Sequence, residues 1–246
     1  MAREDHRDTD RLVVTARAMP QTRGFRHAIV ESSKRHLAVI AEIKRRSPSK
    51  GDLNVGLDPA QLARTYEDGG ATCLSVLTDE HYFGGSRSDL EVARKLSTLP
   101  VIRKDFIVSV GDVCDTRLMG ADCMLLIASA LAPAEMELFF STAVDIGLDV
   151  LVEVHNADEL ERAVGLGATL IGVNQRNLAT FEVDHNRARQ LASLIPSGVV
   201  KVAESGVRDG GDARVLRDCG FDAVLVGESL LISENVSASL ERLQVE

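Results

Sequence analysis

The sequence predicts an α/β fold, a closed (β/α)8 barrel, and three observations support this prediction. Short runs rich in Leu and β-branched residues recur at regular intervals, and stretches with helical spacing lie between them. Several of these runs follow a small-residue turn that suits the end of a helix leading into a strand. The competing fold, an open doubly wound sheet, usually carries a G-x-G-x-x-G loop after its first strand, and no such loop follows the first run here.

The predicted strands follow one another along the chain, and eight strand-helix units in series imply a closed parallel barrel. In order, the eight runs are LAVIAEI from Leu37, TCLSVL from Thr72, PVIRK from Pro100, DCMLLI from Asp122, DVLVEV from Asp149, TLIGVN from Thr169, VVKVAES from Val199 and DAVLVG from Asp222.

The segments between the strands carry turn and helix signals. Small residues precede several strands, at Gly69-Gly70-Ala71, Gly120-Ala121, Gly147-Leu148, Gly167-Ala168 and Gly220-Phe221. After the fifth strand, Leu160, Ala163 and Val164 have helical spacing. Asn156, with Glu159 three residues later, is a variant of the capping box that begins a helix.

We expect a single barrel domain over residues 1–246, because no low-complexity linker divides the chain. Residues 1–36 form an extension before the first predicted strand. Within it, Phe25, Ala28 and Ile29 have helical spacing and predict a short helix that covers one end of the barrel.

The charge balance limits the possible partners. With 28 basic and 37 acidic side chains, the 246 residues carry a net charge of −9, which argues against a nucleic-acid or anionic-membrane surface. A small anionic ligand needs only a few local cations and stays possible. The predicted state is a monomer or a homodimer.

We expect a cytoplasmic location, because the N-terminal residues lack the apolar region of a signal peptide and no apolar run approaches membrane-spanning length. The cysteines form no C-x-x-C pair and are expected to be buried free thiols in a reducing compartment; they are Cys73, Cys114, Cys123 and Cys219.

Charged and polar residues stand at the ends of five predicted strands. Barrel strands alternate inward and outward, and catalytic groups of this fold collect at the strand C-termini. The pairs that share one side are Glu42 with Lys44, Ile102 with Lys104, Leu151 with Glu153, Gly172 with Asn174, and Val202 with Glu204. Any one of them could reach solvent, but together they would be costly to desolvate unless they pair or meet a ligand, which indicates a reaction site.

The turns after the seventh and eighth strands predict a phosphate site. Ser205-Gly206 and Gly227-Glu228 place small residues where backbone N–H groups can approach an oxyanion, and barrels often bind phosphate there. The alternative is that both glycines only serve tight turns. The basic loop Ser47–Gly51 after the first strand is another candidate. We expect no metal site, because the six histidines show no ligand spacing; His155 alone shares the side of Glu153.

A collinear set of motifs from Leu37 to Leu231 resembles the indole-3-glycerol-phosphate synthase family of tryptophan biosynthesis. The motifs are AEIKRRSPSKG from Ala41, LSVLTDEHYFGGS from Leu74, IRKDFIV from Ile102, GADCMLLI from Gly120, LVEVH from Leu151, IGVNQRNL from Ile171, VAESGV from Val202 and LVGESL from Leu225. This resemblance implies a cofactor-free and metal-free ring closure. The phosphorylated, anthranilate-derived substrate 1-(2-carboxyphenylamino)-1-deoxyribulose 5-phosphate would become indole-3-glycerol phosphate, with loss of carbon dioxide and water.

The resemblance also implies roles for individual residues. Lys104 would be the general acid at the substrate carbonyl, Glu153 the acid/base partner in dehydration, and Lys44 a cation near the substrate carboxylate. Glu42 and Glu204 would orient the two lysines, and Asn174 would hydrogen-bond the reacting part of the substrate. Arg176 and Ser47 would be weaker substrate contacts. The residues implied around the phosphate are Ser205, Gly206, Gly227 and Glu228. Phe83, Phe106 and Leu178 in the mouth loops could sandwich the anthranilate ring.

Two other readings stay open at this point. One is a different phosphate-binding barrel, such as an isomerase of the phosphoribosylanthranilate type, which should carry a Cys/Asp or paired Asp set where this chain has Lys and Glu. The other is a catalytically silent barrel that binds an anthranilate-like ligand or serves as an assembly partner.

Overall fold

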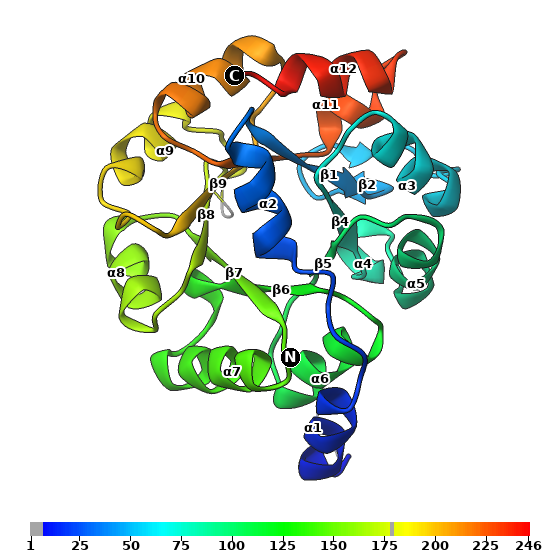
Figure 1. Ribbon diagram of the computed structural model, residues 1–246, viewed down its shortest axis with the longest axis vertical. Coiled ribbons are helices and arrows are strands. Elements are labelled where there is room, and N and C mark those ends of the chain that lie inside the picture. The colour runs from blue at the N-terminus through cyan, green and yellow to red at the C-terminus, as the bar shows by residue number, and fades with distance from the viewer. Residues whose placement is uncertain (1–6, 178–179) are drawn as a thin grey trace.

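The computed structural model describes residues 7–177 and 180–246, and within these residues eight parallel strands close into a barrel (Figure 1). The strands are β1 (Ala38–Ile43), β4 (Cys73–Leu77), β5 (Val101–Lys104), β6 (Cys123–Ile127), β7 (Asp149–Val154), β8 (Leu170–Asn174), β9 (Val200–Glu204) and β10 (Ala223–Val226). Each strand pairs with its neighbour in chain order, and β10 pairs with β1 from Ala38↔Ala223 onward. All eight predicted strands, and the predicted barrel, are thereby confirmed.

Helices follow the barrel strands and form the outer ring seen in Figure 1. They are α3 (Pro59–Asp68), α5 (Arg87–Leu96), α6 (Val110–Leu118), α7 (Pro133–Asp145), α8 (Ala157–Gly165), α9 (His185–Ala192), α10 (Gly210–Asp218) and α12 (Val236–Leu243). Most begin at a side-chain cap, as Asn156 does for α8 by accepting from the Glu159 amide. None of the helices in the described ranges is both long and apolar enough to span a bilayer.

Short elements add to the loops that follow four of the barrel strands, β1, β4, β6 and β10. They are β2 (Arg46–Ser47), β3 (Gly51–Asp52), α4 (Glu80–Phe83), the 3-10 turn Ala128–Ala130 and α11 (Glu228–Leu231). The strands β2 and β3 form a small antiparallel hairpin that contains the basic Ser47–Gly51 loop. At the helix-to-strand turns, glycines such as Gly70 and Gly120 have φ of +84° and +87°, as expected where a helix ends in a left-handed residue.

The apolar core has two parts, one inside the barrel and one between the strands and the outer helices. The interior part includes Phe25 and Ile29 of α2 (Phe25–Ser33), which pack against the inward residues of the strands. In Figure 1, α2 lies across the barrel. The predicted helix over one end of the barrel is thus confirmed, whereas α1 (Thr9–Arg17), which packs on α6, was not predicted.

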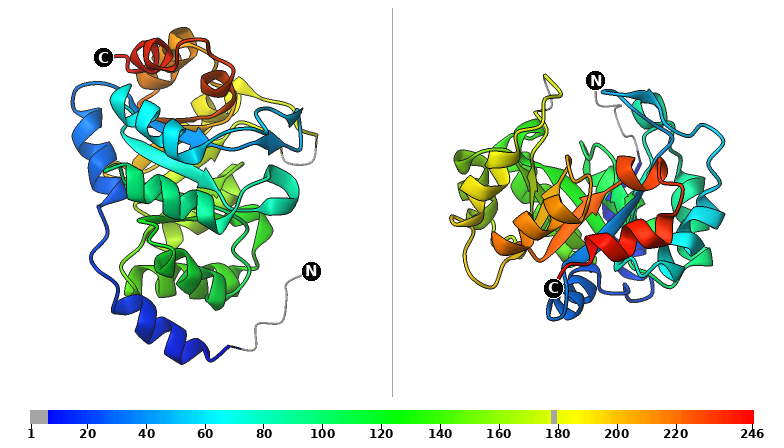
Figure 2. Two further views of the ribbon diagram at one scale, coloured as in Figure 1. Left: turned by 90° about the vertical axis from the view of Figure 1, so that its right-hand side faces the viewer. Right: turned by 90° about the horizontal axis from the view of Figure 1, so that it is seen from above.

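The extension is tied to the same end of the barrel by buried carboxylates. The Arg23 amide donates to Asp122 Oδ1 at 2.7 Å, and the Arg26 amide donates to Asp149 Oδ2 at 2.9 Å. The side view in Figure 2 places α2 at one end of the barrel and the β2–β3 hairpin at the other. Because α2 covers the N-terminal ends of the strands, a ligand can reach the barrel interior only from their C-terminal ends.

Candidate active site

Five of the polar residues predicted at strand ends are buried at the C-terminal mouth of the barrel. Ile102, Leu151 and Val202 belong to the interior core. The residues two positions later therefore also point inward. Lys104 is 8% exposed, and Glu153 and Glu204 are each 2% exposed. Glu42 and Asn174 are buried at the same level, and Lys44 is half-buried.

Lys104 lies between two carboxylates from strands on the far side of the barrel. Its Nζ donates to Glu204 Oε2 at 2.6 Å and to Glu153 Oε2 at 3.2 Å. Barrel closure brings these groups together, because β5, β7 and β9 contribute inward residues at similar heights. A buried ammonium with two carboxylate partners is held in one position and stays charged.

The charges in this cluster shift the pKa of each member. Burial alone would lower the pKa of Lys104, but the neighbouring carboxylates, led by Glu204, outweigh burial and raise it above the ordinary lysine value. Burial favours a high pKa for Glu153 as well, yet the charge of Lys104 and a hydrogen bond from Asn174 hold it below its ordinary value. Burial raises the pKa of Glu204 to about 7, because the charge of Lys104 only partly offsets desolvation. The lysine therefore carries a proton at neutral pH, beside one ionised carboxylate and one that titrates near neutrality.

Asn174 holds the other oxygen of Glu153. Its Nδ2 donates to Glu153 Oε1 at 2.9 Å, while its Oδ1 accepts from the Arg176 amide at 3.0 Å. Arg187 of α9 donates to the Asn174 carbonyl at 3.0 Å. The amide is fixed in one orientation by these contacts, and it fixes the Glu153 carboxylate in turn.

Glu42 and Lys44 form a second ion pair at the end of β1. Lys44 Nζ lies 2.5 Å from Glu42 Oε1, and the buried Tyr66 hydroxyl donates to the Glu42 carbonyl at 3.1 Å. Gly227 is next to this pair, since a Cβ added there would lie 2.5 Å from Glu42 Oε1. Gly227 therefore gives the pair room, a function that the sequence did not predict.

Gly172 leaves room for the side chain of Glu204, as Gly227 does for that of Glu42. A Cβ at position 172 would lie 2.0 Å from Glu204 Oε1, an atom that has no hydrogen-bond partner among the described residues. The glycine in the middle of β8 thus leaves the space that the Glu204 carboxylate occupies beside Lys104.

We expect Gly172→Ala to lower kcat by about 10- to 100-fold, because displacing Glu204 moves the ammonium that it holds. Steady-state kinetics on a correctly folded variant measure this effect. Gly165→Ala is the matched control, since a Cβ there meets no atom within 4 Å. Equal kcat for Gly172→Ala and wild type would contradict the role assigned to this glycine.

The turn after β9 has an unusual backbone that a glutamine side chain supports. Ser205 and Gly206 have φ of +64° and +77°, so successive residues adopt the left-handed conformation. Gln175 is 1% exposed, and its Nε2 donates to the Ser205 carbonyl at 2.8 Å. Gln175 is a positioning residue that sequence reasoning missed, because the contact spans 30 residues of chain.

Glu228 begins α11, and its carboxylate faces Lys50 of the β1 loop. The Lys50 Nζ to Glu228 Oε1 distance is 3.6 Å, and both side chains are more than a third exposed. The pair is weak at such exposure. The Glu228 carboxylate nevertheless points toward the Lys50 ammonium on the adjacent loop.

The aromatic residues predicted at the mouth lie together. The ring centroids of Phe83 and Phe106 are 6.5 Å apart, and Tyr82, which was not predicted, lies 6.1 Å from Phe106. These rings come from the loops after β4 and β5. Leu178, the third apolar residue predicted for the substrate ring, lies outside the described residues.

The two weaker predicted contacts are engaged within their own loops. Arg176 Nη1 donates to the Phe181 carbonyl at 2.9 Å, and the Arg176 backbone pairs with Val183. Ser47 Oγ lies 3.4 Å from Ser49 Oγ in the β2–β3 hairpin. Arg176 therefore meets the Lys104 cluster only through its backbone amide, which donates to Asn174 Oδ1, and no hydrogen bond among the described residues joins either side chain to the cluster.

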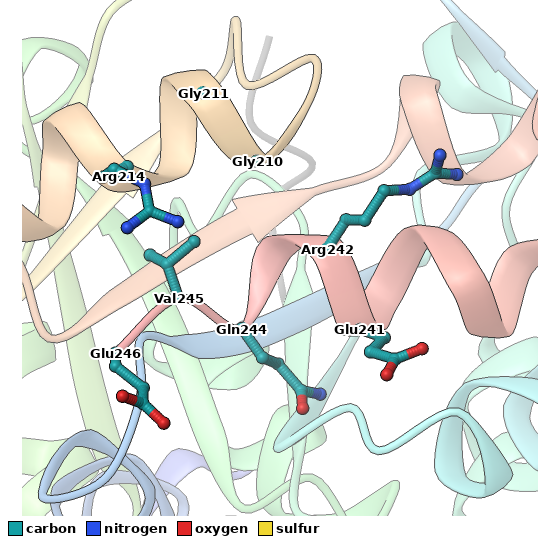
Figure 3. A pocket seen from close by; sticks show the side chains of 8 residues that line it. All are labelled: Gly210, Gly211, Arg214, Glu241, Arg242, Gln244, Val245 and Glu246. Carbon is teal, nitrogen blue, oxygen red and sulfur yellow. The ribbon is translucent and has the colours of Figure 1, made fainter.

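Outside the barrel mouth, the described residues form no cluster of metal ligands, and one pocket lies away from the mouth. The described residues contain no group of three or more His, Cys, Asp or Glu side chains that could hold a metal ion. A pocket of about 650 Å³ lies outside the barrel, between α10 and the end of the chain, as Figure 3 shows. Its lining includes Arg214, Glu241 and Arg242 but none of the residues at the barrel mouth.

Comparison with known proteins agrees with this geometry. A structure of thiamine phosphate pyrophosphorylase from Pyrococcus furiosus has a TM-score of 0.63 at 18% identity and matches 87% of this chain and 95% of that chain, which shows the barrel fold alone. Indole-3-glycerol phosphate synthase of Bordetella pertussis is 46% identical over 94% of this chain and 89% of its own. The synthase of Chlorobium phaeovibrioides is 45% identical over 90% of this chain and 85% of its own. The sequence model of the indole-3-glycerol phosphate synthase family matches residues 2–243 of this chain, and the chain therefore belongs to that family.

Proposed function

We propose that the chain catalyses ring closure of 1-(2-carboxyphenylamino)-1-deoxyribulose 5-phosphate to indole-3-glycerol phosphate, with release of carbon dioxide and water. The observation that carries the proposal is the buried Lys104 ammonium held between Glu153 and Glu204 at the barrel mouth. Family membership supports the same reaction.

Lys104 is the general acid of the first step. Attack by the ring carbon on the substrate ketone builds negative charge on oxygen, and an alkoxide is a stronger base than an amine. The ammonium can therefore stabilise the charge and then donate its proton. The raised pKa of Lys104 ensures that the proton is present when substrate binds.

Lys44 assists the loss of the carboxylate. A cation beside the substrate carboxylate orients that group, and the departure of carbon dioxide restores the aromatic ring. Glu42 keeps Lys44 in place through the 2.5 Å contact. Lys44 is more exposed than Lys104, which suits a residue that meets a substrate group near the mouth.

Glu153 serves the dehydration that follows. The ring carbon next to nitrogen must lose a proton while the hydroxyl leaves as water, so this step needs a base and an acid. The lowered pKa of Glu153 keeps it ionised and able to accept a proton. Its 3.2 Å contact with Lys104 allows the two groups to exchange protons.

The phosphate of the substrate binds at the turns after β9 and β10. The left-handed Ser205-Gly206 turn exposes backbone N–H groups, and Gly227 and Glu228 contribute theirs from the neighbouring strand end. The Glu228 carboxylate does not oppose this role, because it is directed toward Lys50. Phe83 and Phe106 supply the apolar surface for the anthranilate ring.

Ser205→Ala is expected to raise KM by roughly three- to tenfold and to change kcat less, because the hydroxyl contacts the non-reacting phosphate. Initial rates over a range of substrate concentrations separate the two effects. The control is Ser141→Ala, whose hydroxyl donates to the Leu138 carbonyl within α7. A loss of kcat at unchanged KM would contradict this role for Ser205.

The direct test is to mix purified protein with the carboxyphenylamino substrate, without added metal, and follow indole fluorescence. A rise that disappears in the Lys104→Ala variant supports the synthase. Turnover of phosphoribosylanthranilate instead would favour the isomerase. Calorimetric binding of the substrate without product over hours would favour a silent barrel.

We also propose a cytoplasmic location. Cys73 and Cys123 are buried free thiols, and Cys219 is a half-buried free thiol, as suits a reducing compartment. Light scattering on the same preparation would distinguish a monomer from a homodimer.

A further inference from the structure

A histidine that the chemistry above does not use lies directly behind Glu153. His155 Nε2 is 3.5 Å from Glu153 Oε1, and on the other side of the ring Nδ1 is 3.1 Å from Glu159 Oε2 on α8. Nε2 is buried and has no hydrogen-bond partner among the described residues. The imidazole therefore lies between two carboxylates, with Nδ1 engaged and Nε2 facing the base of the proposed reaction.

The Glu159 carboxylate is held rigidly in this arrangement. The His155 amide donates to Glu159 Oε2 at 2.7 Å, and Asn156 Nδ2 donates to Glu159 Oε1 at 2.7 Å. A fixed carboxylate on Nδ1 keeps a proton on that nitrogen and leaves Nε2 as the nitrogen that gains and loses one. The capping motif at the start of α8 thus also orients the imidazole.

The side chain of His155 is more exposed to solvent than that of Glu153. Its side chain is 12% exposed, compared with 3% for Glu153. Glu153 contacts Lys104 through Oε2 and faces His155 through Oε1. Lys104, Glu153 and His155 thus follow one another in a line, and the side chain of His155 is the most exposed of the three.

The proposed reaction requires such a line, because it consumes a proton. The carboxylate leaves as carbon dioxide, and its electron pair returns to the ring. The carbonyl oxygen takes up two protons before it leaves as water, while the carbon next to nitrogen gives up one. One proton per turnover must therefore enter from solvent.

We propose that His155, positioned by Glu159, delivers this proton to Glu153; the inference rests on the proposed function. The Nε2–H bond breaks, its electron pair stays on Nε2, and the proton passes to Glu153 Oε1. A water molecule that enters beside the ring then gives Nε2 a proton and leaves as hydroxide, while the Nδ1 proton stays on Nδ1, where Glu159 accepts its hydrogen bond. The 3.5 Å separation exceeds a hydrogen bond, and a small ring rotation in the substrate complex closes it. Glu153 on β7 and Glu159 on α8 are the charged groups within ion-pair distance of the imidazole in the described residues.

The test compares His155→Ala and His155→Gln with wild type by indole fluorescence between pH 6 and pH 9. Both variants are expected to lose at least about tenfold in kcat with little change in KM. As pH is raised, the kcat of both variants should begin to fall at a lower pH than the kcat of wild type, because the proton must enter without the imidazole as its carrier. Added imidazole should restore much of the activity of His155→Ala and none of that of His155→Gln, whose side chain fills the space.

The matched control is His36→Ala, because His36 lies at the opposite end of the barrel, where its imidazole contacts the neighbouring Leu37 carbonyl. It should keep the wild-type kcat and show no response to imidazole. Wild-type kcat and pH profile in both His155 variants would overturn the relay. So would a loss in His155→Ala that imidazole leaves unchanged while His155→Gln is fully active, since that pattern indicates a structural role. If wild type itself forms no indole-3-glycerol phosphate, the proposed function fails instead.

Discussion

Replacing Lys104 with alanine is expected to lower kcat by roughly 10²- to 10⁴-fold while KM changes little. The ammonium acts on charge that develops in the transition state, so its loss affects turnover more than binding. The substitution also leaves Glu153 and Glu204 without the cation between them, which costs stability by about 3–5 kcal/mol. Indole fluorescence measures kcat, and thermal unfolding measures the stability change.

Lys104→Met also removes the ammonium but keeps most of the side-chain volume, so it separates the loss of charge from the cavity that alanine leaves. Lys201→Ala is the matched control: Lys201 lies on β9 and bonds to the Ala192 carbonyl, away from the mouth. Near-normal turnover by folded Lys104→Met would remove Lys104 from the mechanism.

Glu153→Gln is expected to lower kcat by about 10²- to 10³-fold, because the amide keeps the shape of the side chain but cannot accept the proton. Decarboxylation precedes dehydration, so carbon dioxide release should outpace indole formation and a hydroxylated indoline should accumulate. Rapid-quench analysis of carbon dioxide and indole in the same samples measures the two steps.

The exposed Glu137→Gln on α7 is the control and should behave as wild type. If carbon dioxide and indole formation decline in parallel in Glu153→Gln, with no intermediate, the carboxylate acts before dehydration and its assigned role is wrong.

The fold was predictable because its signals are local. Apolar runs such as LAVIAEI, the helix-to-strand glycines and the Asn156 cap each describe a few consecutive residues. Helix α1 was not predicted; it packs on α6 with most of its residues exposed or half-buried, and Ala16 is its one buried residue.

The membership of the candidate site was also predictable, since alternation along a strand tells which side each residue faces. The Lys104 cluster consists of residues singled out in this way. Gln175 was not found, because its contact with Ser205 depends on how two neighbouring loops meet. Glu228 had no predictable direction until Lys50 was placed across from it.

The sequence by itself determined the order of the strands, the residues at their ends and the side that each one faces, because these follow from short-range periodicity. Only the tertiary structure decided which groups touch. Lys104 meets Glu204 across 100 residues of chain. Gly172 leaves space for that carboxylate, and His155 stands between Glu153 and Glu159. Such distances are set by closure of the barrel and the relative heights of its strands, and no local pattern contains them.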